Sequence, residues 1–138
     1  MEVVARQFEW RLRYPGRDGT LGTPDDLFLV NDLHVPVDED FLVQLKSMDV
    51  LHSFFLPNLR IKQDAVPGMK IPVWFKATET GQFDIVCAEL CGWGHYKMKG
   101  RITVESREDF DRWLESQYAK QEATQPEIDP STSVARTE

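Results

Sequence analysis

The residues best suited to chemistry lie in one short stretch, CAELCGWGHYKM, which runs from Cys87 to Met98. It holds both cysteines of the protein, one of its three histidines and one of its four methionines. Thiolate and thioether sulfurs combined with imidazole nitrogen form a ligand set that suits copper. The pattern C-x-E-x-C-x3-H-x2-M therefore predicts a copper site. Its candidate side-chain ligands are Cys87, Cys91, His95 and Met98.

A second histidine, His52, lies upstream in the apolar, strand-like run DVLHSFFLP. Taken alone, such a histidine is more often a hydrogen-bonded core residue than a ligand. Together with the downstream stretch it gives two thiolates, two imidazoles and one thioether. A mononuclear blue-copper site needs only one cysteine, two histidines and a weak axial methionine. Two bridging thiolates with one imidazole for each metal therefore indicate a two-copper centre.

This motif resembles the binuclear CuA site in subunit II of the haem-copper cytochrome c oxidases. The resemblance runs from about Val3 to Trp113 and includes the flanking segments VLHSFFLP and LRIKQDAVPG. It implies that both cysteines bridge the two copper ions. The implied ligands are Cys87 and Cys91 for both coppers, His52 and Met98 for one, and His95 with the backbone carbonyl of Glu89 for the other.

The resemblance also implies a function and a location. The domain would accept electrons from cytochrome c and pass them to the haem-containing catalytic subunit I of a terminal oxidase, so that by itself it is an electron carrier. It would lie on the extracytoplasmic (periplasmic) face of a membrane as part of a membrane-anchored subunit. The carboxylate of Glu89 would contribute to a magnesium site only in the full complex, because hard oxygen ligands suit that ion.

The first strand departs from the family pattern. Many members read Q-W-x-W here, and the first tryptophan is the point at which electrons arrive from cytochrome c. This chain reads QFEW from Gln7 to Trp10, so Phe8 takes that position and the usual pathway is in doubt. We expect Trp93, inside the copper loop, to be the aromatic substitute. Trp10 is also a candidate, although core packing is its simpler interpretation.

The charge of the chain is −7, from 23 acidic and 16 basic residues. This balance argues against a nucleic-acid partner, which requires a basic surface. It fits a basic c-type cytochrome, because opposite charge speeds encounter. The alternative is a solvated face that only maintains solubility. The candidate docking residues are the acids Asp25, Asp26, Asp38, Glu39, Asp40 and Asp49.

The length of 138 residues allows one domain with a real core. No run of eighteen apolar residues is present, and Met1 is not followed by a signal-peptide pattern. Family subunits carry transmembrane helices before this domain. We therefore expect an excised soluble domain that starts at an artificial methionine; a separate water-soluble protein is the alternative.

Short alternating segments predict an all-β fold. Residues 4–14 alternate over enough length to form one half-buried strand, which Pro15 and Gly16 would end. Similar runs recur as FLVQLKS, IPVWFKAT and FDIVC. About eight strands of this kind indicate a sandwich or barrel. The resemblance narrows this to a cupredoxin-like Greek-key fold over residues 1–105, with the copper loops at one end.

The end of the chain breaks this pattern. Ser106 is a good N-cap, and Glu108 and Asp109 favour the positive end of a helix. We expect a helix over residues 106–120 that packs on the barrel, and a disordered polar tail over 121–138. The residues spaced as one apolar helical face are Phe110, Trp113, Leu114 and Tyr118.

Two other features have simple interpretations. His34 lies in NDLHVPVDED and is expected to be an ordinary histidine of a surface loop. The glycine-rich stretch RDGTLGTPDD contains enough oxygen ligands to hold calcium, but its spacing does not match an EF-hand. A hairpin loop is the simpler prediction.

Several rival functions remain open from the sequence. A CuA domain of a nitric oxide reductase would have the same ligands, whereas the copper loop of nitrous oxide reductase resembles C-x-W-x-C and here has Glu89 in the middle. A copper chaperone or storage module would bind copper without fast electron transfer. A structural zinc site would leave Met98 idle. A disulfide between Cys87 and Cys91 is expected mainly in copper-free protein.

Overall fold

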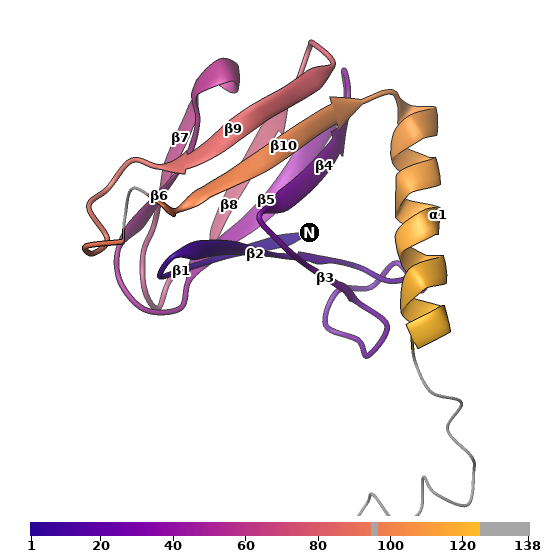
Figure 1. Cartoon of the computed structure of the whole chain (residues 1–138), viewed down its shortest axis with the longest axis horizontal. Coiled ribbons are helices and arrows are strands. Elements are labelled where there is room, and N and C mark those ends of the chain that lie inside the picture. The colour runs from indigo at the N-terminus through magenta and orange to yellow at the C-terminus, as the bar shows by residue number, and fades with distance from the viewer. Residues whose placement is uncertain (95–96, 125–138) are drawn as a thin grey trace, which may run out of the picture.

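A computed structural model describes residues 1–94 and 97–124 of the chain (Figure 1). These residues form ten strands, one short 3-10 helix (Pro57–Leu59) and one α-helix, α1 (Arg107–Thr124). The strands are β1 (Glu2–Arg6), β2 (Glu9–Tyr14), β3 (Leu27–Val30), β4 (Asp32–Pro36), β5 (Asp40–Ser47), β6 (His52–Leu56), β7 (Ile61–Ala65), β8 (Ile71–Lys76), β9 (Gly81–Cys87) and β10 (Lys99–Glu105).

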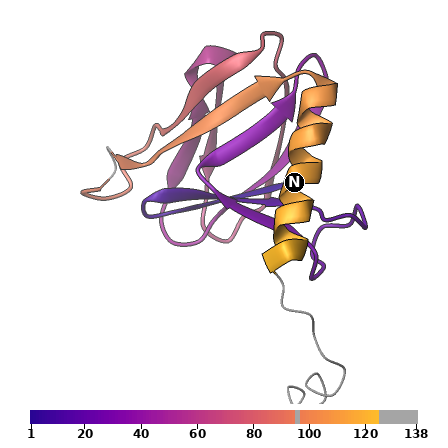
Figure 2. The same cartoon turned by 45° about the vertical axis from the view of Figure 1, so that its right-hand side comes forward.

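The strands form two five-stranded sheets with a common core between them (Figures 1 and 2). One sheet has the order β3-β2-β1-β5-β8, and the other has the order β4-β10-β9-β6-β7. Both sheets are mixed, because β1 pairs with β5 in parallel and β10 pairs with β4 in parallel. The expectation of an all-β sandwich with a C-terminal helix is confirmed.

Alternation along the strands fills the core as the sequence predicts. In β5, Val43 and Leu45 are completely buried, and β8 contributes Val73 and Phe75 to the same core. The antiparallel register places Val43 opposite Val73, so the apolar faces of the two strands coincide. Successive side chains of a strand point to opposite faces, so these positions share one side of the sheet.

The segment 4–14, predicted to be one strand, is instead a hairpin of β1 and β2. Its register ends at the pair Arg6–Glu9, which leaves only Gln7 and Phe8 in the turn. The paired residues share a face, so odd positions are buried in β1 and even positions in β2. The prediction was wrong because neither turn residue is a glycine or proline that would have marked the reversal.

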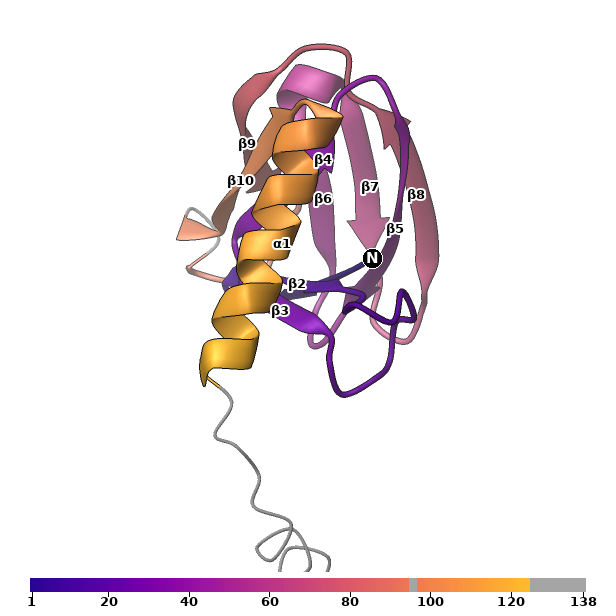
Figure 3. The same ribbon diagram turned by 90° about the vertical axis from the view of Figure 1, so that its right-hand side faces the viewer.

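Helix α1 begins as expected, with the backbone N–H of Asp109 donating to Ser106 Oγ at 3.1 Å. It crosses the edge strands β3 and β4, one from each sheet (Figure 3). Phe110 is buried, and the rest of the predicted face packs partly buried against the core; these residues are Trp113, Leu114 and Tyr118. The helix continues to Thr124, so it includes the first residues of the expected tail. The remainder of that tail, 125–138, lies outside the described residues.

The expectation for His34 was wrong, because this residue lies in strand β4 and not in a surface loop. Its side chain is only 12% exposed. The imidazole stacks on Trp113 of α1, with ring centroids 3.9 Å apart and an angle of 8° between the planes. A single-sequence pattern could not reveal this contact, because the two residues are far apart in the chain.

The sandwich has one end where the chemically interesting segments meet. Strand β9 ends at Cys87, β6 begins at His52 and β10 begins at Lys99, all at this end, together with the β1–β2 turn (Figure 1). We call it the metal end. Helix α1 starts at the opposite end. Within residues 1–94 and 97–124, no helix has the length and apolar character that a bilayer span requires.

Candidate metal centre

Strand pairing brings together ligands that are distant in the sequence. Strands β6 and β9 pair antiparallel, with Phe54 opposite Cys87. His52 lies two residues before Phe54 and therefore points to the same inner face as this phenylalanine. As a result His52 is completely buried, and Cys87 is 7% exposed at the end of β9.

The donor atoms converge at this point. The Nδ1 atom of His52 lies 3.8 Å from Cys87 Sγ, and one donor atom from each of His52, Cys87 and Cys91 lies within 4.8 Å of the others. The loop adds two further donors. The thiol of Cys87 donates to the backbone oxygen of Glu89 at 3.1 Å, and the thiol of Cys91 lies 3.8 Å from Met98 Sδ.

Five of the six predicted ligands therefore share one small volume. Cys91 is 4% exposed and Met98 is 1% exposed, so the sulfur donors are shielded from water. Cys87 and Cys91 are not joined in a disulfide. The sixth predicted ligand, His95, lies outside the described residues. A buried set of two thiols, one thioether, one imidazole and one carbonyl fits copper better than a hard cation.

The orientation of His52 supports metal binding. Its Nε2 lies 2.7 Å from Asp49 Oδ1, so the neutral ring donates Nε2–H to the carboxylate. This tautomer leaves the lone pair of Nδ1 directed toward the thiols. Metal-binding histidines commonly donate their other N–H to a carboxylate, which fixes the ring and raises its basicity.

The metal-free site also has perturbed acidities. Burial lowers the pKa of His52, but hydrogen bonds with Cys87 and Asp49 outweigh it and raise the pKa above its ordinary value. Burial raises the pKa of Cys87, but hydrogen bonding to His52 and nearby backbone groups lowers it overall. Burial and the neighbouring Cys87 raise the pKa of Cys91. The two cysteines thus differ in how readily they lose a proton.

An aromatic layer covers the inner side of the site. Phe54 is completely buried, and Trp10 contacts it edge-on with ring centroids 5.4 Å apart. The Trp10 ring also lies 6.4 Å from that of His52. Leu56 is also buried, whereas Phe55 is only partly buried because it points to the other face of β6. Apolar residues of this kind limit water at a metal site and so influence its reduction potential.

The three candidate aromatic residues for electron uptake occupy different environments. Trp93 is 86% exposed in the loop between β9 and β10, which we call the metal loop. Phe8 contacts it edge-on with ring centroids 6.2 Å apart. Trp10 is completely buried, so it cannot touch a docked donor. Of the three, only Trp93 combines broad exposure with a position in the loop, and Phe8 contacts it from the β1–β2 turn.

The acidic residues predicted for docking do not form one patch. Asp26 is buried and pairs with Arg13 at 2.6 Å. Three of the acids, Asp38, Glu39 and Asp40, lie where β4 turns into β5. This turn is at the end opposite the metal site (Figure 1). Asp25 lies in the β2–β3 loop. Of the six acids only Asp49 adjoins the site, where its carboxylate accepts a hydrogen bond from His52.

The β2–β3 loop, considered for calcium, places the carboxylates of Asp18, Asp25 and Asp26 within reach of one another. The carboxylate of Asp26 already accepts hydrogen bonds from Arg13 and from the backbone N–H of Gly22. These contacts within the protein account for the buried charge, so a plain loop remains the simpler interpretation.

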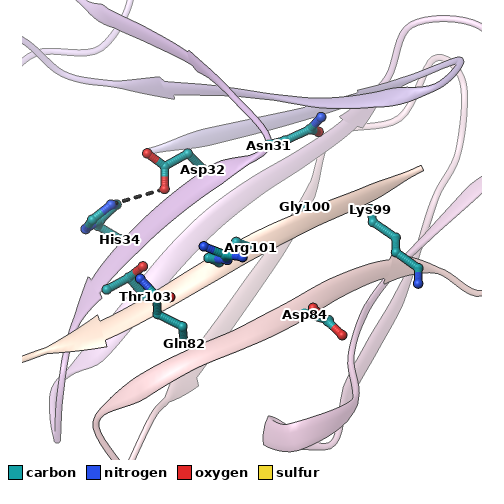
Figure 4. Close-up of a pocket in the computed structure, with 9 residues that line it drawn as sticks. All are labelled: Asn31, Asp32, His34, Gln82, Asp84, Lys99, Gly100, Arg101 and Thr103. Atoms are coloured by element: carbon teal, nitrogen blue, oxygen red, sulfur yellow. Dashed lines mark ion pairs between the residues drawn. The ribbon is translucent and has the colours of Figure 1, made fainter. Parts of the chain in front are cut away.

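An open cavity of about 680 Å³ lies away from the metal site on the outer face of β4, β10 and β9. It is open and polar, and an Asp32–His34 ion pair at 3.1 Å lies on its wall (Figure 4). This cavity is therefore separate from the donor atoms of His52 and the two cysteines.

Two functional contacts were not expected from the sequence. Asp49 was assigned to docking, although its place three residues before His52 could have suggested a hydrogen-bonding partner. Gln7 was not considered, yet its side chain reaches the metal loop and donates to the backbone oxygen of Cys91 at 2.5 Å. No local pattern in the sequence connects these two segments.

Comparison with known proteins agrees with this geometry. Residues 6–106 match the family described as cytochrome c oxidase subunit II, periplasmic domain. The chain is 40% identical over 139 aligned positions to the alternative cytochrome c oxidase subunit 2 of Bradyrhizobium diazoefficiens, covering 85% of this chain and 50% of that relative. The chain belongs to the cytochrome c oxidase subunit II family. It spans about half the length of that curated relative, and about a third of the same subunit from Thermostichus vulcanus.

Solved structures give the same result. The periplasmic domain of cytochrome oxidase subunit II from Bradyrhizobium japonicum superposes with a TM-score of 0.74 at 32% identity, covering 86% of this chain and 92% of that one. The subunit II domain in a mixed disulfide with a thioredoxin-like protein gives a TM-score of 0.69 at 33% identity, covering 86% and 89% of the two chains. The fold is therefore the cupredoxin-like sandwich of this family.

Proposed function

We propose that this domain is the point at which electrons enter a terminal oxidase, through a binuclear mixed-valence CuA centre. The observation that carries the proposal is the buried cluster of His52, Cys87 and Cys91, whose donor atoms lie within 4.8 Å of one another. Met98 and the backbone oxygen of Glu89 adjoin the same two thiols. His95 is the second imidazole ligand in this proposal.

The chain supplies a rigid, shielded frame for the metals. Two copper ions, when bound, provide a one-electron couple shared between them. Cys87 ends β9 and Met98 immediately precedes β10, so both ends of the loop are held by the sheet. His52 approaches from a third strand, β6. Ligands fixed in this way move little when the charge of the site changes, and a small reorganisation favours fast electron transfer.

The donor in this proposal is a c-type cytochrome that docks at the metal end. Trp93 and Leu90 of the metal loop are 86% and 83% exposed, so a partner can contact the loop directly. Other exposed apolar residues precede His52 in sequence: Met48, Val50 and Leu51. Exposed apolar groups that gather near one site mark an interaction surface. Among the six predicted acids, Asp49 alone lies at this end.

The acceptor is the haem-containing subunit I of the same oxidase. The domain would lie on the periplasmic side of the membrane, as the matching family does, within a membrane-anchored subunit. The side chain of Glu89 is partly exposed in the loop. Its carboxylate is available for a magnesium ion shared with subunit I, because the backbone oxygen, and not the carboxylate, faces Cys87.

The site must hold two free thiols before copper enters. A relative has been captured in a mixed disulfide with a thioredoxin-like protein. We expect the corresponding step here: a thioredoxin-like dithiol reduces a Cys87–Cys91 disulfide and is itself oxidised to a disulfide. Oxidised, copper-free protein should therefore take up copper only after treatment with a dithiol, whereas reduced protein should take it up directly.

The first test combines copper content with electron paramagnetic resonance. We expect two coppers per chain and one unpaired electron shared by both nuclei, and we expect Cys87→Ser to abolish this signal. One copper with an ordinary mononuclear spectrum would reject the binuclear centre. A mixed-valence spectrum without rapid reduction by cytochrome c would instead favour a copper-binding module.

A second test examines the route into the site. Trp93→Ala should slow electron transfer from cytochrome c without changing the copper spectrum. Trp74→Ala is the matched control, because Trp74 is also widely exposed, at 68%, but lies on β8 outside the metal loop. Equal rates for both variants would remove Trp93 from the pathway. Transfer of electrons to a nitric oxide reductase rather than to an oxidase would support the alternative assignment.

A further inference from the structure

The β1–β2 turn contacts the metal end from two directions. Its first residue, Gln7, donates its side-chain Nε2–H to the backbone oxygen of Cys91 at 2.5 Å. The backbone N–H of the same residue donates to Asp49 Oδ2 at 2.7 Å. One residue therefore reaches both the metal loop and the segment that precedes β6.

The contact with Asp49 extends to a candidate ligand. The other carboxylate oxygen, Oδ1, accepts from His52 Nε2 at 2.7 Å and from the backbone N–H of Val50 at 2.6 Å. Asp49 is thus fixed by three donors from two parts of the chain. Through this carboxylate, Gln7 is connected to His52, while its amide group is connected directly to Cys91.

Packing reinforces the hydrogen bonds. The Phe8 ring lies so close to the loop that a Cβ atom on Gly94 would be 2.5 Å from its Cδ2 atom. A Cβ atom on Gly92 would lie 2.7 Å from Gln7 Nε2, and this glycine has φ of +142°, a conformation that other residues rarely adopt. The two glycines allow the turn to approach the loop backbone directly.

We propose that Gln7 is a positioning residue for the metal centre, which holds the Cys91 side of the loop and the His52 side in a fixed relation before copper binds. The inference rests on the proposed function for the identity of the metal. The geometric part does not, because both hydrogen bonds join protein atoms only. Groups that orient metal ligands affect metal affinity, commonly by about 10-fold to 100-fold.

The test replaces the amide and keeps the size of the side chain. Gln7→Leu removes the donor, and Gln7→Glu places an acceptor against the Cys91 oxygen. Gln82→Leu and Gln82→Glu are matched controls, because Gln82 is exposed at the start of β9 on the outer wall of the large cavity. Both Gln7 variants should bind copper about 10-fold to 100-fold more weakly in competition with a chelator, and their paramagnetic resonance spectrum should change.

A second measurement uses copper-free protein. Amide hydrogen exchange at Gly92 and Trp93 should be faster in the Gln7 variants than in the wild type and in the Gln82 variants. Because β1 and β2 pair through their own backbones, exchange in the rest of this hairpin should be unchanged. General destabilisation would accelerate exchange in both regions.

The outcomes separate the two proposals. If wild-type protein lacks a binuclear spectrum, the proposed function fails, and the exchange measurement still decides the role of Gln7. If the wild-type spectrum is binuclear but the Gln7 variants match the Gln82 controls, Gln7 has no positioning role. Weaker copper binding with an unchanged spectrum and unchanged loop exchange would also overturn the positioning role, because the loss of a positioning residue must alter the geometry of the loop.

Discussion

Two histidines of this domain have carboxylate partners. His52 lies at the metal end, and His34 lies on the side covered by α1, which we call the helix side. His52 directs Nε2 to Asp49 and Nδ1 toward the thiol of Cys87. His34 has a carboxylate at each nitrogen: Glu105 lies 2.8 Å from Nδ1 and Asp32 lies 3.1 Å from Nε2. One imidazole therefore keeps a nitrogen available for a metal, whereas the other has both nitrogens occupied.

The difference shows how surroundings decide the role of a side chain. Two carboxylates favour the protonated, cationic form of His34. From β4, this residue contacts β10 through Glu105 and α1 through the ring of Trp113. A single carboxylate beside His52 fixes the tautomer and leaves the other nitrogen facing sulfur. The first arrangement stabilises the fold, and the second prepares a ligand. Replacing His52 should therefore affect the copper spectrum, whereas replacing His34 should affect the stability of the fold.

The largest effect is expected from His52→Gln compared with His34→Gln. The first change removes a proposed ligand and should abolish the shared-electron spectrum, because an amide is a poor substitute for imidazole at copper. The second should leave copper stoichiometry and spectrum unchanged. Copper analysis and paramagnetic resonance on both variants measure this. Loss of the spectrum in His34→Gln would contradict the division of roles.

Truncation on the helix side should reduce stability without affecting the metal. Phe110 is 6% exposed and packs between α1 and the core, so Phe110→Ala should lower the free energy of unfolding by about 3–5 kcal/mol. Denaturant unfolding of the metal-free protein gives this value. At temperatures where the variant is folded, its copper spectrum should equal that of the wild type. An altered spectrum would mean that the two regions are coupled.

The contribution of His34 should depend on pH. Burial lowers its pKa, but Asp32 and Glu105 outweigh this and raise the pKa above the ordinary value of 6.5. A raised folded-state pKa means that the stabilisation is fully present below pH 6.5 and is lost as the pH rises through the folded-state value. We expect about 1–3 kcal/mol at low pH.

The measurement is the difference in unfolding free energy between wild type and His34→Gln across this pH range, which cancels the titration of His52. The groups that contact the imidazole are Asp32, Glu105 and the ring of Trp113. A difference that grows with pH would show that the histidine is held neutral.

The smallest effect is expected from Arg17→Ala. Arg17 joins the β2–β3 loop to α1 through Glu115 at 2.8 Å and Glu122 at 2.5 Å. All three side chains are at least 44% exposed, so water and salt screen these ion pairs. Thermal unfolding should shift slightly at low ionic strength and not at all near about 1 M salt, where the Debye length is about 3 Å. A large, salt-independent shift would indicate a packing role instead.

The sequence by itself determined which potential ligands are present and where most of the strands lie. Four candidate ligands fall between Cys87 and Met98, and their types and spacing do not depend on the rest of the fold. Alternation also indicated the buried faces of β5 and β8, because a strand exposes every second side chain to the core. The helical face containing Phe110 followed from its periodicity in the same way.

Only the tertiary structure decided how distant residues act together. Strand pairing brought His52 to Cys87, and the packing of the two sheets brought Gln7 to Cys91. The same folding placed the carboxylate of Asp49 against His52. These relations depend on register and on the path of the turns, and a change of one residue in register turns every side chain of a strand to its other face.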